Sequence, residues 1–218
     1  MPISEDDARD GNIYIYKLTC DNGGAPCIHG GVLSLAICKP RIRQRAQIGD
    51  WIIGFGARGM PELTHRLIYI ARVTAVEENG GYFEKEAYLH RPDCIYRRIG
   101  PGYQYRQDGR YHGPEDLEHD LGEPPHFDRA RTLLSASGSF VYFGKNLAPD
   151  INEVQNIYEG LPRDYRLNHA PNDRESLEDF IVSIFGQFGP GRHGEPTHGE
   201  TSAKCNVSED DVKEFPRC

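Results

Sequence analysis

The sequence predicts an α+β domain with a small, mostly antiparallel curved sheet or barrel, flanked by helices and followed by an irregular tail. Three observations support this fold class. Segments such as Ile13–Leu18 and Arg66–Val76 are rich in β-branched and aromatic residues, as strands are. Over residues 177–188, apolar side chains recur at i, i+3, i+4 and i+7, which predicts a core-facing helix. The 24 glycines and 15 prolines among 218 residues indicate long loops.

The length of 218 residues is enough for one domain with a real core. Residues 1–12 are acidic and polar and predict a flexible leader, residues 13–188 predict the folded domain, and residues 189–218 lack apolar periodicity and predict a polar tail. Within the domain, residues 97–127 mix tyrosine with arginine and predict a long polar loop. That loop could stack on an unpaired base and contact phosphate, or it could simply pack as a solvated surface loop.

In the N-terminal half, the strand Ile13–Leu18 is followed by Thr19–Gly31, a loop rich in Gly, Asn and Asp. Val32–Cys38 is apolar and predicts a buried strand or the start of a helix. A short basic helix begins at Pro40, and Asp50–Phe55 is the next strand. The remaining expected elements are helices at Tyr82–Leu89, Asp128–Leu134 and Asp150–Gly160, a strand at Ser139–Phe143, and a helix beginning at Asn172 or Asp173.

Charge and composition exclude several classes of protein. A net charge of −8 argues against a general nucleic-acid coat protein, although a local basic site on an acidic body remains open. The chain has no apolar run of about 18 residues, and its N-terminus is unlike a signal peptide. We therefore expect a soluble, cytoplasmic protein without a membrane partner. Six cysteines are too sparse for a disulfide scaffold, so we expect reduced thiols.

The basic segment before the second strand is the most distinctive feature. Lys39, Arg41, Arg43 and Arg45 occupy every second position. On a helix, Arg41 and Arg45 would share an exposed face, and Arg43 would lie near its boundary with the core. Guanidinium groups bind phosphate in a bidentate manner, so this segment predicts a phosphate site. The alternative is a solvated basic surface helix.

Cysteine and histidine near the glycine-rich loop raise two further possibilities. Cys20, Cys27, His29 and Cys38 contain ligand types for zinc, but their spacing lacks closely paired cysteines, so we predict no metal site. Cys27 could instead be a nucleophile with His29 as its base. None of the common nucleotide-hydrolase, dinucleotide, esterase or zinc-protease motifs occurs, and no cofactor is predicted.

Arg91 and Asp93 flank Pro92 in a rigid turn. Such a turn could aim a cation and a carboxylate at a ligand. An internal Arg–Asp pair that closes a loop is the simpler interpretation.

Five segments together carry a recognisable set of motifs: YKLTCDNGGAPC (Tyr16–Cys27), LSLAICKPRIRQRAQIGDWIIGFG (Leu33–Gly56), LIYIARVT (Leu67–Thr74), RPDCIY (Arg91–Tyr96) and FVYFGKNLAP (Phe140–Pro149). The set resembles the nucleotide modification associated domain 2 family. This resemblance implies a link with systems that make or handle modified bases in the DNA of phages and bacteria. The order of elements is also similar to base-recognising barrels of the PUA, ASCH and EVE type, whose cleft takes a flipped nucleotide; that second similarity is one of fold alone.

The resemblance and the residues together favour binding of a nucleotide or modified base. Phosphate would meet the basic helix, residues 21–24 would lie against sugar or base, Trp51 or Tyr96 could stack, and Asp93 could accept a hydrogen bond from a base edge. Trp51 is equally placed to be core, which we favour. The candidate binding residues are Asn22, Gly23, Gly24, Lys39, Arg41, Arg43, Arg91, Asp93 and Tyr96.

Two other functions remain open at this point. The protein could be an enzyme acting on a modified nucleotide or base, with Asp21, Cys27 or Asp93 as acid, base or nucleophile. It could also be an interaction module of a larger DNA-modification or phage-defence complex, with the Tyr- and Arg-rich loop as its contact surface. The expected partners are a nucleotide or DNA containing modified bases, and proteins of a modification system.

Overall fold

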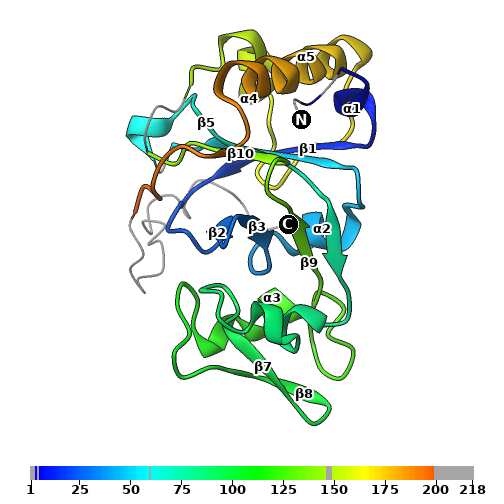
Figure 1. Cartoon of the computed structure of the whole chain (residues 1–218), viewed down its shortest axis with the longest axis vertical. Helices are drawn as coiled ribbons and strands as arrows, with labels where there is room; N and C mark the ends of the chain where they lie inside the picture. The colour runs from blue at the N-terminus through cyan, green and yellow to red at the C-terminus, as the bar shows by residue number, and fades with distance from the viewer. Residues whose placement is uncertain (1–2, 4, 59, 146–148, 199–218) are drawn as a thin grey trace.

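The computed structural model describes residues 3, 5–58, 60–145 and 149–198. Its elements are stacked in layers along the long axis of the molecule (Figure 1). A helical layer lies at one end, a mixed sheet lies beneath it, a second sheet follows, and a small hairpin-and-helix layer forms the other end. The predicted α+β class is confirmed.

The first sheet, sheet A, has the strand order β1-β4-β5-β10-β11. Its strands are β1 (Ile13–Leu18), β4 (Trp51–Gly56), β5 (Leu67–Arg72), β10 (Phe140–Tyr142) and β11 (Gly191–Arg192). β1 runs parallel to β4 and β10 parallel to β11, while the inner pairs are antiparallel. Parallel neighbours need a long crossover, and residues 19–50 supply it for β1 and β4.

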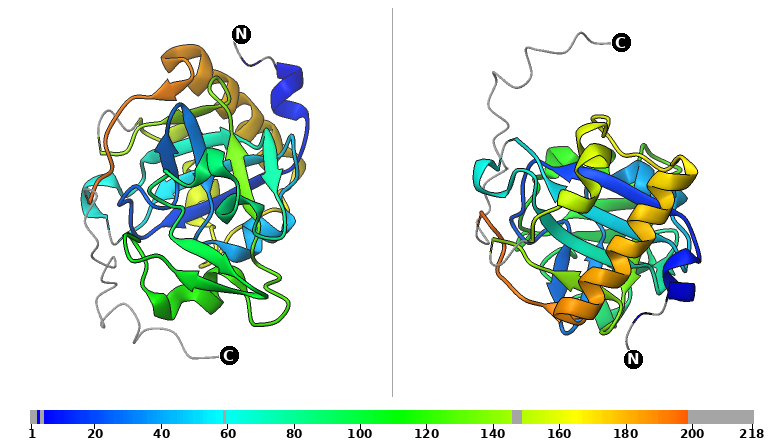
Figure 2. Two further views of the ribbon diagram at one scale, coloured as in Figure 1. Left: turned by 60° about the horizontal axis from the view of Figure 1, so that its bottom comes forward. Right: turned by 90° about the horizontal axis from the view of Figure 1, so that it is seen from above.

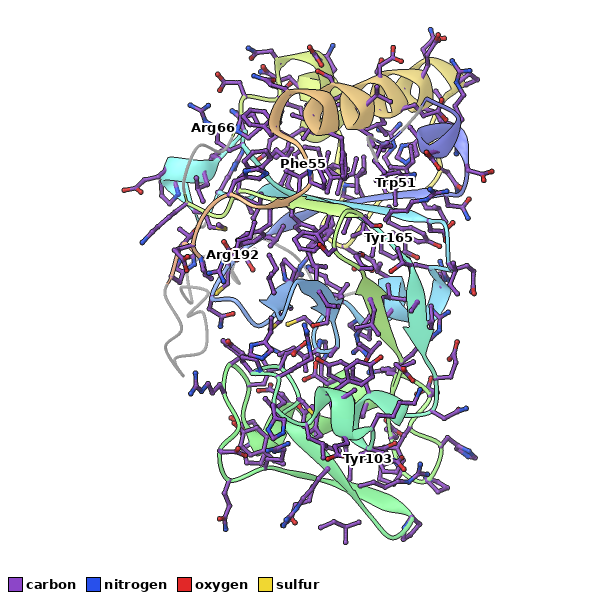
Figure 3. The ribbon with its side chains drawn as sticks, viewed as in Figure 1. Trp51, Phe55, Arg66, Tyr103, Tyr165 and Arg192 are labelled. Atoms are coloured by element: carbon purple, nitrogen blue, oxygen red, sulfur yellow. The ribbon has the colours of Figure 1, made fainter. Side chains whose placement is uncertain are left out.

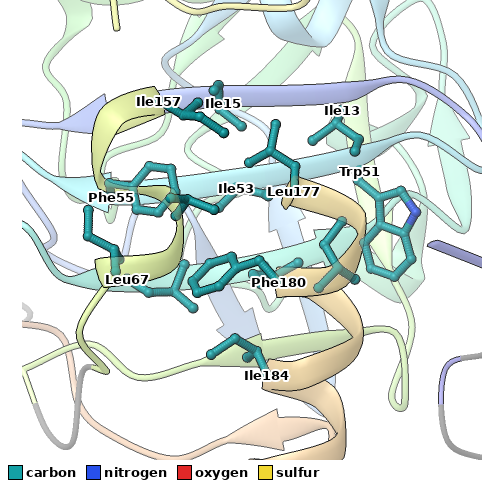
Figure 4. Close-up of a cluster of buried hydrophobic side chains, with 14 of the residues drawn as sticks. Ile13, Ile15, Trp51, Ile53, Phe55, Leu67, Ile157, Leu177, Phe180 and Ile184 are labelled. Carbon is teal, nitrogen blue, oxygen red and sulfur yellow. The ribbon is translucent and has the colours of Figure 1, made fainter. Parts of the chain in front are cut away.

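One face of sheet A is covered by α5 (Pro171–Phe188), α4 (Gln155–Glu159) and α1 (Glu5–Arg9), as the right-hand view of Figure 2 shows. Leu177, Phe180 and Ile184 of α5 pack on apolar side chains of β1 and β4 (Figure 4). Trp51 is fully buried in this cluster and meets Phe185 edge to face, so it is a core residue. The predicted helix after residue 172 is confirmed by this packing.

The other face of sheet A meets the second sheet, sheet B, of order β2-β3-β9-β6. Its strands are β2 (Cys27–His29), β3 (Val32–Leu35), β9 (Thr132–Ser135) and β6 (Ala75–Glu77), and α2 (Pro40–Arg45) packs beside it. Along β1, Ile13 and Ile15 face α5, whereas Tyr14 and Tyr16 face sheet B, the alternation expected of a strand. Across the described residues the sheets remain open, so the predicted barrel alternative is wrong and the mostly antiparallel sheet flanked by helices holds.

The far layer holds the segment predicted as a long polar loop. It contains the hairpin β7 (Tyr96–Ile99) and β8 (Gly102–Tyr105), the turn η4 (Pro114–Asp116) and α3 (Leu117–Leu121). Tyrosines build its core: Tyr96 meets Phe83, and Tyr103 meets Phe127 edge to face. Figure 3 places Tyr103 in this layer, far from sheet A. The segment expected as an irregular loop over residues 97–127 therefore contains most of a β-hairpin, a 3₁₀ turn and a short helix.

Other elements depart from prediction. Tyr82–Leu89 forms the 3₁₀ turns η2 (Gly81–Phe83) and η3 (Glu86–Tyr88) in place of one helix. The helix predicted at Asp128–Leu134 is wrong, because β9 is inserted between β3 and β6. Arg66–Val76 divides into β5 and β6. Two more 3₁₀ turns, η1 (Pro61–Leu63) and η5 (Asn152–Val154), complete the described elements. η5 leads into α4, and both lie within the helix predicted over Asp150–Gly160.

Both ends of the chain contribute to the fold. The leader forms α1, whose Ala8 is buried, and the Asp7 carbonyl accepts a hydrogen bond from Trp51 Nε1 at 3.2 Å. The start of the predicted tail forms β11, while residues 199–218 lie outside the described residues. In the described part of the chain, none of the helices combines the length and apolarity needed to cross a membrane.

Candidate active site

Cys38 lies at a tight corner between β3 and α2. Cys38 and Lys39 both adopt left-handed conformations, with φ of 58° and 43°, which a non-glycine residue holds only when its surroundings fix it. The fixing bonds are present: the Cys38 N–H donates to Asp120 Oδ1 at 2.9 Å, and the Cys38 carbonyl accepts from Arg43 Nε at 2.7 Å. The corner is thus anchored on both sides of the thiol.

The thiol faces an imidazole and a carboxylate in series. Cys38 Sγ lies 3.0 Å from His112 Nε2, and His112 Nδ1 lies 2.6 Å from Asp120 Oδ2. The Tyr96 hydroxyl also donates to Asp120 Oδ2, at 2.8 Å. Asp120 is fully buried on α3. These contacts join residues that are 74 and 82 positions from Cys38 in the chain.

The charges in this series support one another. Burial opposes the protonation of His112, but hydrogen bonds to Asp120 and Cys38 outweigh it and raise the pKa of His112 to about 10. Burial likewise opposes the ionisation of Asp120, yet the hydrogen bond from His112 holds the pKa of that carboxyl below its ordinary value. His112 is therefore an imidazolium at neutral pH. A thiol in hydrogen-bond contact with an imidazole has the arrangement of an activated cysteine nucleophile.

A cavity of about 260 Å³ opens beside the three groups. Cys38, His112 and Asp116 line it from one side, and Asn22 and Ala25 of the glycine-rich loop line it from another. A second cavity, next to Gly23 and Cys27, measures about 20 Å³, room for a single water. The larger cavity is near the lower end of the range for small-molecule sites.

The predicted loop residues border these cavities. Asn22 Oδ1 accepts the Gly24 N–H at 3.1 Å, which fixes its carboxamide on the cavity wall. Gly24 packs flat on Tyr111, where an added Cβ would lie 2.6 Å from the ring Cγ. Asp21 is buried and accepts the Tyr142 hydroxyl at 2.8 Å; burial raises the pKa of Asp21.

The predicted phosphate cations do not converge. Arg43 is fully buried and donates only to backbone carbonyls, so its predicted contact with phosphate is wrong. Arg41 is exposed and pairs with Asp164 at 3.4 Å. Lys39 lies with its ammonium 4.8 Å from the centre of the Tyr16 ring, and burial lowers the pKa of Lys39.

The turn at Arg91 and Asp93 is internal. Asp93 is fully buried and accepts hydrogen bonds from Ser34 Oγ at 2.5 Å and the Tyr82 hydroxyl at 2.6 Å. Arg91 Nε lies 3.5 Å from the Asp93 carboxylate and donates to the Tyr82 hydroxyl at 2.7 Å. The interpretation as an internal pair is confirmed, and direct ligand contact by either residue is wrong. Tyr96 is also fully buried, so it cannot stack on a base.

The surroundings of Cys27, the predicted nucleophile, do not suit a nucleophilic thiol. Cys27 is buried, and burial together with the nearby Asp93 raises the pKa of Cys27 well above its ordinary value, which suppresses thiolate formation. Asp21 and Asp93 are enclosed by protein hydrogen bonds and face no substrate space. Among the residues that the structure describes, no three His, Cys, Asp or Glu side chains gather as a metal site.

The predicted reduced state holds for some of the cysteines. Cys27, Cys38 and Cys94 are free thiols. Cys20 is disulfide-bonded, and the prediction is wrong for it.

Sequence reasoning missed the three groups that the fold brings together. Cys38 was assigned to a buried apolar run, and His112 and Asp120 fell in the presumed polar loop. The only local signal is a cysteine at the junction between an apolar strand and the Pro40 helix start. The partners of a catalytic cysteine have no fixed spacing from it, since they meet only in the fold.

The thiol and the imidazole line the cavity, and the buried Asp120 carboxylate lies behind the imidazole. This series has an arrangement of the cysteine-nucleophile type. The family model described as nucleotide modification associated domain 2 matches residues 10–203. The chain belongs to this family, as its motifs predict, and the family description links it to nucleotide modification. Comparisons with curated proteins and with solved structures returned no match.

Proposed function

We propose that the protein is an enzyme of a nucleotide-modification system that uses Cys38 as a nucleophile to remove or transfer an acyl group carried by a nucleotide. The observation that carries this proposal is the series from Cys38 Sγ to His112 Nε2 at 3.0 Å and from His112 Nδ1 to Asp120 at 2.6 Å. In this proposal Cys38, His112 and Asp120 take the place of Asp21, Cys27 and Asp93 as the candidate catalytic residues.

The proposed reaction has two halves. The Cys38 thiolate adds to the acyl carbon, and the bond to the leaving nitrogen or oxygen breaks as the His112 imidazolium gives that atom its proton. This leaves a thioester on Cys38 and a neutral imidazole. Water or another acceptor then gives a proton to His112 and attacks the thioester, which releases the acyl product and restores the thiolate–imidazolium pair. Asp120 stays ionised and orients the ring throughout.

The remaining predicted binding residues keep a role in this proposal. The Asn22 carboxamide lies on the cavity wall and would donate to the acyl oxygen, as oxyanion-stabilising amides do. Gly23 and Gly24 would let the loop approach sugar or base closely. Lys39 directly follows the nucleophile in the chain, and Arg41, whose side chain is exposed, would meet phosphate. The substrate is then a nucleotide, or DNA with an acylated base, delivered with partner proteins of the modification system.

The test is capture of the acyl group on the enzyme. Full-length protein would be incubated with N-acetylated deoxyadenosine and deoxycytidine monophosphates, quenched in acid, and analysed by mass spectrometry. We expect an acetyl adduct on Cys38 that is absent from Cys38→Ser and unchanged in Cys27→Ser. In parallel, iodoacetamide at pH 7 should modify Cys38 far faster than glutathione. Alkylation of Cys38 no faster than glutathione would overturn the proposal.

A second candidate is binding of a nucleotide or modified base without turnover. It is favoured by the position of Asn22 and Ala25, residues of the family-matching loop, on the cavity wall. Native mass spectrometry of protein purified from its host would detect a retained nucleotide. Retention that is equal in wild type and Cys38→Ala, without any thiol adduct, would support binding alone.

A further inference from the structure

Arg43 is a buried cation whose acceptors are carbonyl oxygens. It is fully buried, although arginine is among the residues least often found inside. Its Nε donates to the Cys38 carbonyl at 2.7 Å, and its Nη2 donates to the Asp120 carbonyl at 2.6 Å. Its Nη1 donates to the carbonyls of Arg129 and Arg131 at 2.6 and 2.7 Å.

Two of these four acceptors belong to residues of the candidate active site. A single planar guanidinium therefore connects the backbone of the thiol residue to the backbone of the carboxylate residue. Because the guanidinium is rigid, its fork sets the distance between the two carbonyls. The Asp120 side chain closes the same loop by accepting the Cys38 N–H. The left-handed corner at Cys38 is thus held from both of its peptide groups.

The buried charge also acts on the site. Burial lowers the pKa of Arg43 to about 10, and the nearby Asp120 and Cys38 counteract that shift. Arg43 therefore stays charged at neutral pH. The interaction is reciprocal for the carboxyl: the positive charge of Arg43 helps to hold the pKa of Asp120 below its ordinary value.

We propose that Arg43 is a positioning residue of the thiol site, which fixes the backbone of Cys38 against the backbone of Asp120. This inference rests on the proposed function. A purely structural Arg43 would hold α2 in place and leave the reactivity of the thiol unaffected.

Arg131 provides a matched control. It is also a buried arginine and donates to the carbonyls of Arg43 and Ala46, the latter at 2.6 Å, and to Glu78 at 2.7 Å. Its bonds to α2 lie toward the C-terminal end of the helix, whereas Cys38 precedes the N-terminal end. A change at Arg131 removes comparable buried hydrogen bonds without touching the thiol, the imidazole or the carboxylate.

The experiment measures how the rate of Cys38 alkylation by iodoacetamide depends on pH, read by mass spectrometry of the Cys38 peptide from folded full-length protein. Arg43→Gln removes both the charge and the fork that fixes Cys38 against Asp120, and we expect the half-maximal pH of alkylation to rise. Arg43→Lys keeps a charge but loses the fork, and we expect a smaller rise. Arg131→Lys should lower the urea midpoint and leave the half-maximal pH unchanged.

Three outcomes separate the ideas. If Arg43→Gln does not fold, the shift in Arg43→Lys decides. Folded Arg43 variants with the wild-type pH profile, or a shift as large in Arg131→Lys, would overturn the positioning role and leave the proposed function standing. A wild-type Cys38 that reacts like a free thiol would overturn the proposed function itself.

Discussion

The protonation state of His112 is the most direct physical test of the site. The substitution Asp120→Asn keeps the shape of the side chain and removes its charge. The imidazolium then loses the carboxylate oxygen that lies 2.6 Å from its Nδ1. Because burial disfavours the charged ring and only the contacts with Cys38 remain to oppose it, we expect the pKa of His112 in this variant to fall well below its wild-type value.

The expected magnitude follows from the wild-type shift. The pKa of His112 is raised from 6.5 to about 10, and each unit corresponds to about 1.4 kcal/mol. Protonated His112 therefore stabilises the folded state by on the order of 5 kcal/mol. Since the folded-state pKa is the higher one, this contribution is complete below pH 6.5 and is lost as the pH rises through about 10. Asp120 and Cys38 share it, and the hydrogen bond from Asp120 is the largest single favourable cause.

Two measurements check this prediction. The Cε1–H resonance of His112, identified by its absence in His112→Gln, should titrate near pH 10 in wild type and at a clearly lower pH in Asp120→Asn. Urea unfolding should show wild type losing stability between pH 6 and pH 9, and the variant losing much less. Asp116→Asn, on the wall of the same cavity, should preserve the wild-type titration. A wild-type His112 that titrates near 6.5 would refute the reasoning.

Three further predictions concern the surroundings. Asp93→Asn should lower the free energy of unfolding by about 3–5 kcal/mol, because it leaves the buried Arg91 without its charge partner; a loss below 1 kcal/mol in urea titration contradicts this. Gly24→Ala should cost about 1–3 kcal/mol in the same assay, since its Cβ would press on Tyr111. Arg41→Glu should change the free energy of unfolding by less than about 1 kcal/mol, because the Arg41 side chain is 73% exposed. The same variant should bind nucleoside monophosphates more weakly in calorimetry. An unchanged affinity would show that Arg41 does not contact phosphate.

Local sequence patterns predicted the helix that buries one face, α5, and the strands that are buried along nearly their whole length, β1 and β4. α5 was predicted because its five buried apolar residues repeat at helical spacing. β1 and β4 were predicted because β-branched and aromatic residues fill them. Their parallel pairing depends on where the crossover of residues 19–50 returns the chain, which no local pattern specifies.

The far layer could not be predicted by the same reasoning because its core is made of tyrosine. Tyr96 is fully buried and Tyr103 is half-buried, while the arginines of β7 stay exposed. A mixture of Tyr and Arg has the composition of a solvated loop. β9 was mistaken for a helix for a related reason: Asp128 has the appearance of an N-cap, and the pairing of β9 with β3 and β6 comes from residues far away in the chain.

The misreading of Arg43 shows how the site is assembled. The alternating cations of residues 39–45 have the composition of a phosphate site, but a helix turns successive residues by about 100° and so separates them. Ile42 and Ala46 take the core side, and Arg43 is carried inward with them. A charge in that position must find oxygen acceptors, and backbone carbonyls of Cys38, α3 and the approach to β9 provide them. The cation predicted to hold the oxygens of a ligand holds those of the protein, which fixes the corner where the thiol stands.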